Sequence, residues 1–144
     1  MADSMTKKER EQFLAGVHVG VFSVADKGRG PLTVPVWYLY EPGGEIAIWT
    51  GKDSRKARLL EQAGRFSFCV QDERPPYKYV SVEGPVTGVE QASLEELVRP
   101  LAVRYLGAEA AESYLVDLGG PEGVSDDIMI RMRPERWNSL DFSS

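Results

Sequence analysis

The chain has 144 residues, of which 42% are hydrophobic and 27% are charged, a composition typical of soluble globular proteins. This length predicts a single domain over residues 1–144 with a sizeable core. The formal net charge of −5 argues against non-specific nucleic-acid binding, which needs a basic surface. No run approaches the roughly 18 apolar residues of a membrane span, and the charged beginning of the chain lacks the apolar segment of a signal peptide.

The counts of cysteine and histidine exclude several kinds of site. Cys69 is the only cysteine, so no intramolecular disulfide can form, and we expect a cytoplasmic protein. Cys69 lies in the apolar run FSFCV, which predicts a buried and unreactive thiol. His18 is the only histidine, so a catalytic triad or a zinc site is disfavoured. The chain also has no glycine-rich P-loop.

In the first half of the chain we expect one helix, then strands and a second helix. Thr6 and Glu9 have the spacing of a capping box, which predicts a short helix that ends at Gly16. Apolar alternation and β-branched residues predict the strands that follow. Ser54 begins a basic helical segment that Gly64 ends. The expected strands cover 17–25, 32–40, 45–50 and 65–72, and the second helix covers 54–63.

The second half is expected to add a long strand, two helices and a final strand region. The strand at 79–89 should bend at Gly84 and Pro85. Ser93 is the expected N-cap of a helix that Pro100 kinks or splits. We expect a helix at 93–107, a second at 108–118, a loop at 119–127 and one or two strands at 127–142, broken near Pro134.

The count of expected elements indicates the fold class. Six to seven mostly antiparallel strands outnumber three or four helices, and their connections are short. This pattern predicts a mainly β (α+β) protein in which helices pack outside a small barrel.

The basic segment at 54–58 is the first candidate site. Ser54, Arg55, Lys56 and Arg58 lie at an expected helix start, where free backbone N–H groups and the positive end of the helix dipole favour a phosphate. The alternative is an ordinary solvated basic helix face. The sequence segment by itself leaves both interpretations open.

The loop at 75–79, Pro-Pro-Tyr-Lys-Tyr, is the second candidate, because it presents a lysine between two tyrosines. Such a loop suits a planar anionic ligand, although a stiff surface loop explains the same residues. Trp37 and Tyr38 are neighbours on a strand and should face opposite sides, one toward the core and one toward a groove or a partner. Trp49 and Trp137 are expected to be core or interface aromatics rather than ligand contacts.

The order of these motifs resembles that of the pyridoxamine 5′-phosphate oxidase-like superfamily. The resemblance covers about residues 10–140 and rests on VPVWY, on T-x-x-x-S-R-K-x-x-x-L from Thr50 to Leu60, and on K-Y-V-x-V-x-G from Lys78 to Gly84. It implies a split β-barrel that works as a homodimer, with two cofactors at the subunit interface. The basic substrate motif of true pyridoxamine phosphate oxidases is not evident in the C-terminal RWNSLDFSS.

Within the superfamily, the chain looks most like the oxidoreductases that use the deazaflavin coenzyme F420. This likeness implies that the Ser-Arg-Lys segment holds the cofactor phosphate, that the preceding strands line the ring, and that the loop before the fifth strand closes the site of the partner subunit. Lys52, Arg58 and Lys78 are candidates for the oligoglutamate tail. The implied cofactor-binding residues are Val34, Pro35, Val36, Trp37, Thr50, Ser54, Arg55, Lys56, Pro76, Lys78 and Tyr79.

The implied activity is hydride transfer from the reduced cofactor to an activated double bond of a small molecule. A proton would come from Tyr38, from Tyr79 or from solvent. The first alternative is an FMN-binding protein similar to pyridoxamine 5′-phosphate oxidase, or a flavin reductase, because FMN carries the same kind of ring, ribityl chain and phosphate. The second alternative is a carrier that binds the cofactor without turnover.

Overall fold

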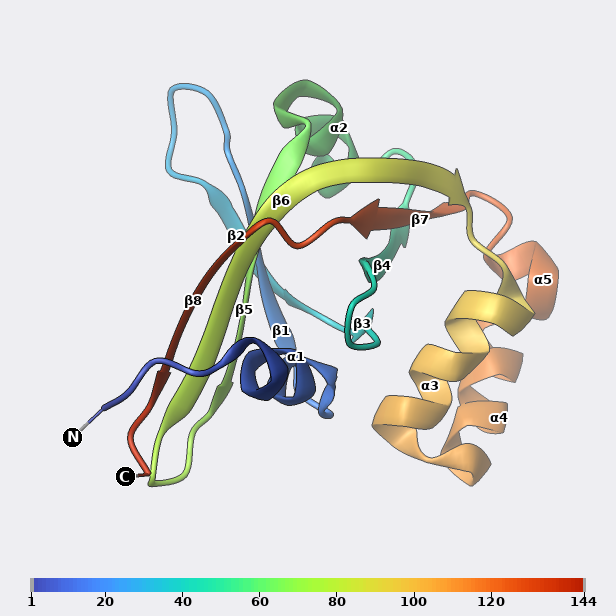
Figure 1. Cartoon of the computed structure of the whole chain (residues 1–144). Helices are drawn as coiled ribbons and strands as arrows, with labels where there is room; N and C mark the ends of the chain where they lie inside the picture. The colour runs from blue at the N-terminus through green and yellow to red at the C-terminus, as the bar shows by residue number, and fades with distance from the viewer. Residues whose placement is uncertain (1, 144) are drawn as a thin grey trace.

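Eight strands form a curled antiparallel sheet in the computed structural model, which describes residues 2–143 (Figure 1). Their order is β2-β1-β5-β6-β7-β4-β3, and β8 pairs with β6 beside this path. The strands are β1 (Gly20–Val24), β2 (Leu32–Val36), β3 (Tyr38–Leu39), β4 (Ile46–Gly51), β5 (Arg65–Asp72), β6 (Lys78–Gln91), β7 (Asp127–Met132) and β8 (Arg136–Asp141).

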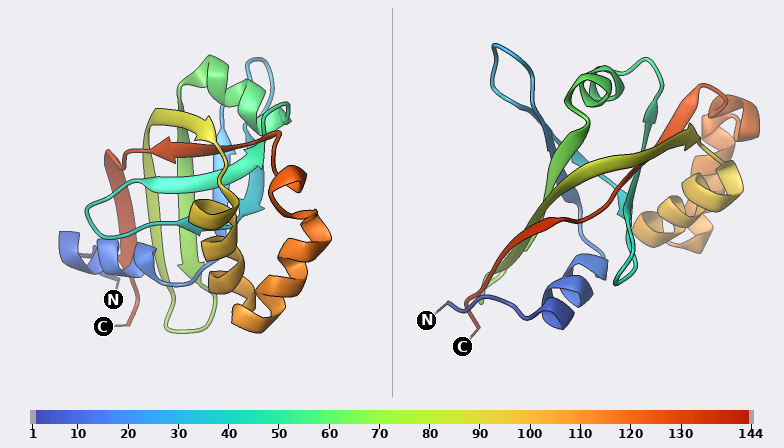
Figure 2. Two further views of the ribbon diagram at one scale, coloured as in Figure 1. Left: turned by 90° about the vertical axis from the view of Figure 1, so that its right-hand side faces the viewer. Right: turned by 45° about the horizontal axis from the view of Figure 1, so that its top comes forward.

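Strand β6 joins the two halves of the sheet because it is long enough to belong to both. Its first part pairs with β5 and β8, whereas its last part, from Val86 onward, pairs with β7. The register shifts between Val86 and Gly88, and a shift of this kind bends a strand. Figures 1 and 2 show β6 arching from one half to the other, so the sheet curls into the split β-barrel that the resemblance implied.

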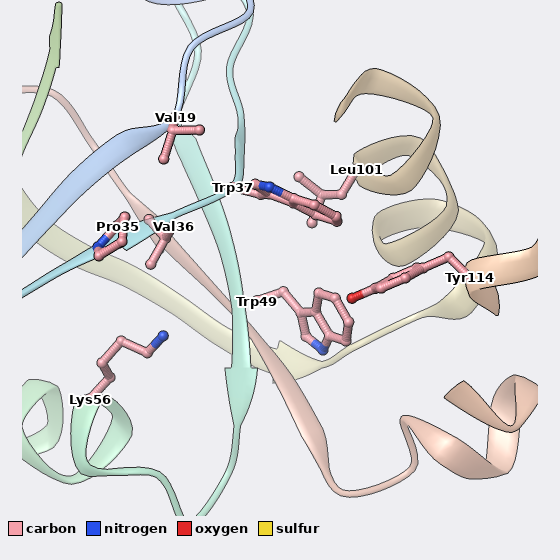
Figure 3. A pocket seen from close by; sticks show the side chains of 8 residues that line it. All are labelled: Val19, Pro35, Val36, Trp37, Trp49, Lys56, Leu101 and Tyr114. Atoms are coloured by element: carbon pink, nitrogen blue, oxygen red, sulfur yellow. The ribbon is translucent and has the colours of Figure 1, made fainter. Parts of the chain in front are cut away.

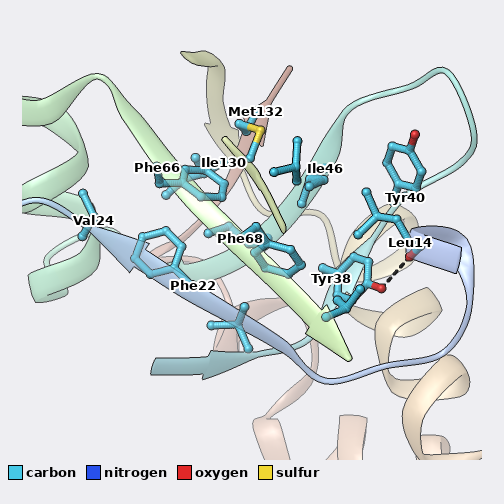
Figure 4. Packing of buried hydrophobic residues seen from close by; sticks show 14 of the residues in the cluster. Leu14, Phe22, Val24, Tyr38, Tyr40, Ile46, Phe66, Phe68, Ile130 and Met132 are labelled. Atoms are coloured by element: carbon cyan, nitrogen blue, oxygen red, sulfur yellow. Dashed lines mark hydrogen bonds between the residues drawn. The ribbon is translucent and has the colours of Figure 1, made fainter. Parts of the chain in front are cut away.

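The main core fills the space between the two halves (Figure 4). Alternate side chains of the strands point inward, as the period of two predicted, and include the fully buried Phe22, Phe68 and Ile48. Tyr38 is also fully buried, and its hydroxyl donates a hydrogen bond to the Leu14 carbonyl oxygen at 2.5 Å. Helix α1 (Lys7–Ala15) therefore packs on the core through Leu14.

The other helices pack around the barrel and largely match the expected ranges. Helix α2 (Arg55–Ala63) follows the N-cap Ser54, and Gly64 ends it in the left-handed conformation, with φ of 72°. The remaining elements are η1 (Leu94–Val98), α3 (Arg99–Leu106), α4 (Ala108–Leu118) and α5 (Gly120–Gly123). Helices α3 and α4 pack against each other beside β3 and β4. Leu97 of η1 and Leu101 of α3 form a small core against Trp37 and Trp49.

Three local features differ from the sequence expectations. The expected strand at 32–40 is interrupted at Trp37, which leaves the ladder between β2 and β3. The helix expected at 93–107 begins as the π-helical turn η1, in which the Val98 N–H donates to the Ser93 carbonyl; Pro100, which has no N–H, follows this turn. The expected loop at 119–127 contains the short helix α5, and the final region is two strands, β7 and β8.

Replacing Thr6 with alanine should lower the free energy of unfolding by about 1 kcal/mol. The Thr6 hydroxyl accepts from the Glu9 N–H at 3.2 Å, and the Glu9 carboxylate accepts from the Thr6 N–H at 2.9 Å. Urea denaturation of the variant measures the loss. Ser4→Ala is the matched control, because Ser4 is exposed and caps no helix; equal losses in both variants would contradict a stabilising capping box.

No helix within residues 2–143 is long and apolar enough to cross a membrane.

Candidate functional site

A pocket of about 400 Å³ lies where β2, β4, α2 and the α3–α4 pair meet (Figure 3). Its walls are mostly apolar and aromatic, and the exposed side chains of Val19 and Pro35 mark an edge that opens to solvent. A pocket of this size and character suits a small organic ligand. The lining residues are Val19, Pro35, Val36, Trp37, Trp49, Lys56, Leu101 and Tyr114.

Lys56 is the one charged residue among those that line the pocket. It is half-buried, and its ammonium forms no hydrogen bond or ion pair with any of residues 2–143. Burial lowers the pKa of Lys56 below its ordinary value, because the charged form loses hydration. A half-buried cation without a protein partner is stabilised by a nearby anion, so Lys56 favours negative charge at this end of the pocket.

The start of α2 adds uncommitted donors next to Lys56. Lys56 and Arg55 occupy the first two positions of the helix, where backbone N–H groups have no intrahelical acceptor. The Ser54 hydroxyl accepts from the Ala57 N–H at 3.1 Å and lies 2.9 Å from the Thr50 hydroxyl. This cap holds the first turn of α2 against β4, and it leaves two N–H groups beside an unpaired ammonium.

The other cations of the segment already have partners. Arg55 forms an ion pair with Asp26 at 2.5 Å, and Arg58 donates to the Asp53 carbonyl oxygen at 2.9 Å. Lys52 pairs with Asp126 at 3.3 Å. The three predicted phosphate ligands therefore differ: Lys56 lines the pocket, Ser54 caps the helix, and Arg55 is tied to the turn before β2.

Trp37 forms a flat wall of the pocket, and its ring is held in place by Tyr105. Its ring stacks on that of Tyr105 with centroids 5.1 Å apart and planes 6° from parallel. Tyr105 in turn donates to the His18 carbonyl oxygen at 2.7 Å. As predicted from the sequence, Trp37 and Tyr38 face opposite sides: Trp37 lines the pocket and Tyr38 lies in the main core.

Several predicted site residues lie outside the pocket in this chain. Val34 is partly buried against the main core. Lys78, 3.8 Å from Asp141 in an ion pair, begins β6, and Figure 1 shows the β5–β6 turn at the opposite end of the sheet from α2. Pro76 and Tyr79 flank Lys78 and share that end. A single chain thus does not bring Pro76, Lys78 and Tyr79 to Lys56.

Four pocket residues were not among the predicted site residues. Trp49, expected to be a core or interface aromatic, packs against the small core of Leu97 and Leu101. It also lines the pocket, and its indole N–H donates to Asp127 at 2.8 Å. The alternation of β4 offered a signal, because Trp49 points away from the face that buries Ile48. Val19, Leu101 and Tyr114 had no such signal, since they come from other elements that only the fold brings near.

Three other residues considered from the sequence do not line this pocket. His18 has its Nε2 2.9 Å from the Phe13 carbonyl oxygen. Cys69 is half-buried on β5, and burial raises the pKa of its thiol. The Tyr38 hydroxyl is bonded within the core, so it does not reach the pocket as a proton donor. Among residues 2–143, no group of three or more His, Cys, Asp or Glu side chains could hold a metal ion.

Comparison with known proteins identifies the family. The family model described as pyridoxamine 5′-phosphate oxidase matches residues 6–141, whereas no curated protein matches the chain. A solved structure of a conserved hypothetical protein from Mycobacterium tuberculosis is similar, with a TM-score of 0.73 and 21% identity over 96% of this chain and 86% of that one. Two more structures share the fold. An F420 reductase has a TM-score of 0.63 and 19% identity over 89% of this chain and 94% of its own, and an FAD-binding protein from Mesorhizobium loti has a TM-score of 0.64 and 19% identity over 98% and 96%.

The family match covers nearly the whole chain, and the similar structures share its split β-barrel. The chain therefore belongs to the pyridoxamine 5′-phosphate oxidase family.

Proposed function

We propose that the protein binds coenzyme F420 in the pocket beside α2 and reduces an activated double bond of a small molecule. The observation that carries this proposal is Lys56, a half-buried ammonium without a partner among residues 2–143, beside free N–H groups at a helix start. These groups suit the phosphate that such cofactors carry.

The residues of the pocket fit a cofactor of this shape. Lys56 and the first turn of α2 would hold the phosphate, while Pro35, Val36 and Trp37 form an apolar wall for a flat ring. Reduced F420 supplies a hydride when bound. The chain itself positions the ring and keeps water from its apolar side, which is how a protein contributes when the cofactor carries the chemistry.

A second copy of the chain would complete the site. Val19, just before β1, and Val21, on β1, are 54% and 38% exposed. The strand pairing places Pro35, Val21 and Cys69 side by side across β2, β1 and β5. Apolar side chains in a row on an uncovered sheet face are typical of an interface. In the proposed homodimer, the 76–79 segment of one copy, with Pro76, Lys78 and Tyr79, would approach the pocket of the other.

FMN is the alternative cofactor, because one phosphate site serves either molecule. The resemblance of the Ser-Arg-Lys pattern to F420-dependent enzymes supports the first choice, and the likeness to an F420 reductase agrees with it. A carrier that only binds the cofactor is the alternative to an enzyme.

Titration of the purified protein with F420 and with FMN should show tighter binding of F420. Fluorescence of the cofactor follows the binding, and light scattering of the same samples should give twice the mass of one chain. Reduced F420 should then be consumed when an enone or a quinone is added.

Each alternative has its own result in this experiment. Micromolar FMN binding without a response to F420 would overturn the choice of cofactor. Binding without consumption would indicate a carrier. The mass of a single chain with cofactor bound would rule out the shared site.

A further inference from the structure

The connection between β1 and β2, residues 25–31, lies at the same end of the sheet as α2 (Figures 1 and 2). Asp26 is its one residue that is not exposed. The Asp26 carboxylate forms an ion pair with the Arg55 guanidinium at 2.5 Å. In the part of the chain that the structure describes, no other side-chain hydrogen bond or ion pair joins this connection to an element beyond β1 and β2. Asp26 is therefore the residue that ties the 25–31 connection to α2.

Arg55 is placed where two anions can reach it. It occupies the first position of α2, next to Lys56 and to the free backbone N–H groups of the helix start. Side chains of a helix tilt toward its N-terminus, so a side chain at this position reaches the space beyond the helix start, where the phosphate is proposed to bind. The structure shows the guanidinium engaged by Asp26 instead. Asp26 and a phosphate at this helix start thus require the same guanidinium.

The two anions differ in how strongly they hold Arg55. The Arg55 side chain is 45% exposed, and ion pairs of exposed side chains change an equilibrium constant by about fivefold or less. A phosphate offers at least two oxygens that share its negative charge, and a guanidinium can bind both at once. The same phosphate would also bind Lys56 and the free N–H groups. Exchange of the carboxylate for the phosphate is therefore favourable, and the ion pair lowers the affinity by only a modest factor.

We propose that Asp26 regulates the phosphate site by competition: its carboxylate and the phosphate bind the Arg55 guanidinium alternately, so that cofactor binding releases the 25–31 connection from α2. This inference rests on the proposed function, because it requires a phosphate at the start of α2. The competition is reciprocal, since Asp26 weakens phosphate binding by the same factor by which phosphate weakens the ion pair. A residue that does not line the pocket thus adjusts the affinity of the site.

Replacing Asp26 with asparagine should tighten binding of F420 and of FMN about two- to fivefold, because Arg55 loses its competing charged partner. Asparagine keeps the size of aspartate and removes its charge. Fluorescence titration measures both affinities. Riboflavin is the matched ligand, because it lacks the phosphate of FMN, and its affinity should be the same for the variant and for the unaltered protein.

Two further variants separate competition from a general effect of charge. In a protein that carries Arg55→Met, adding Asp26→Asn should give no gain, whereas direct repulsion between Asp26 and the phosphate would give the same gain without Arg55. Glu61→Gln removes one negative charge at an exposed position near the other end of α2, and it should change none of the affinities. An Asp26→Asn variant without a gain, or with a gain that persists without Arg55, would overturn the proposal.

Hydrogen exchange of the 25–31 connection tests the reciprocal effect without the cofactor. The Arg29 N–H donates to the Asp26 carbonyl oxygen at 2.9 Å, so its exchange reports on the order of this connection. Inorganic phosphate, compared with sodium chloride at equal ionic strength, should speed this exchange severalfold in the unaltered protein. It should have no effect in Asp26→Asn, in which the connection is already released. Equal exchange of the unaltered protein in the two salts would contradict the competition.

Failure of this inference can be distinguished from failure of the proposed function. F420 binding with equal affinities for Asp26→Asn and the unaltered protein would remove the competition and leave the cofactor in place. Release of the connection by inorganic phosphate without any binding of F420 would do the reverse. Absence of binding for F420, FMN and inorganic phosphate alike would overturn both.

Discussion

Replacing Lys56 with methionine should weaken binding of the phosphate-bearing cofactor by about 1.5–3 kcal/mol, or roughly ten- to a hundredfold. Methionine retains most of the apolar stem of lysine and removes the charge. Lys56 has no competing acidic partner among residues 2–143, so its whole charge is free to meet the phosphate. Fluorescence titration with F420 and with FMN measures the loss.

Two properties separate this effect from damage to the fold. The Lys56 ammonium is partly desolvated and unpaired, so its removal should leave the free energy of unfolding unchanged or raise it. Lys8→Met is the matched control, because Lys8 is exposed on α1, and it should leave the affinity unchanged. Equal affinities of Lys56→Met and the unaltered protein would remove Lys56 from the cofactor site.

The pKa of Lys56 also predicts how the affinity for the cofactor changes with pH. Burial lowers the pKa of the free protein's Lys56, and a bound phosphate would raise it again by stabilising the charged form. The Lys56 ammonium loses its proton as the pH rises through this lowered pKa. Affinity for the phosphate should therefore fall on the alkaline side, and Lys56→Met should abolish this fall.

Replacing Gly84 with alanine should destabilise the fold by about 3 kcal/mol or more, because the new methyl group has no room. A Cβ at Gly84 would lie 1.8 Å from the carbonyl oxygen of Arg133, which belongs to the backbone between β7 and β8 and cannot turn aside. This is the place where β6 passes from one half of the barrel to the other, so relief would require moving two strands.

Gly88→Ala is the matched control on the same strand. A Cβ there meets only side-chain atoms of Glu90 and Arg131, at 3.6 and 4.0 Å, and both side chains can shift. Gly88→Ala should lower the free energy of unfolding much less than Gly84→Ala does. Urea or thermal denaturation of the two variants measures the difference; equal stabilities would show that the strands separate near Gly84 without strain.

Local patterns along the chain were sufficient to predict most elements. The ranges 65–72 and 108–118 are found as β5 and α4, and α2 follows Ser54 as its cap. Strand alternation, caps and glycine stops act over a few residues, so they are readable without the fold. The resemblance of the Ser-Arg-Lys and Lys-Tyr-Val segments then identified the superfamily.

Contacts between distant segments determine which residues of the site form ion pairs and which line the pocket. Asp26 forms an ion pair with Arg55 across 29 positions. No spacing rule predicts that Lys56, its neighbour, has no ion pair with any of residues 2–143. Likewise, Trp49 and Tyr114 line the same pocket because the α3–α4 pair packs against β4.

The sequence by itself determined the elements, the family and the basic helix start, because each is encoded in neighbouring residues or in an ordered set of motifs. The tertiary structure decided that Lys56 has no ion pair among residues 2–143, that Trp37 rather than Tyr38 faces the pocket, and that Tyr114 lines the pocket. It also placed Lys78 at the far end of the sheet from Lys56. These outcomes follow from strand pairing and helix packing, in which every side chain depends on partners far away in the chain.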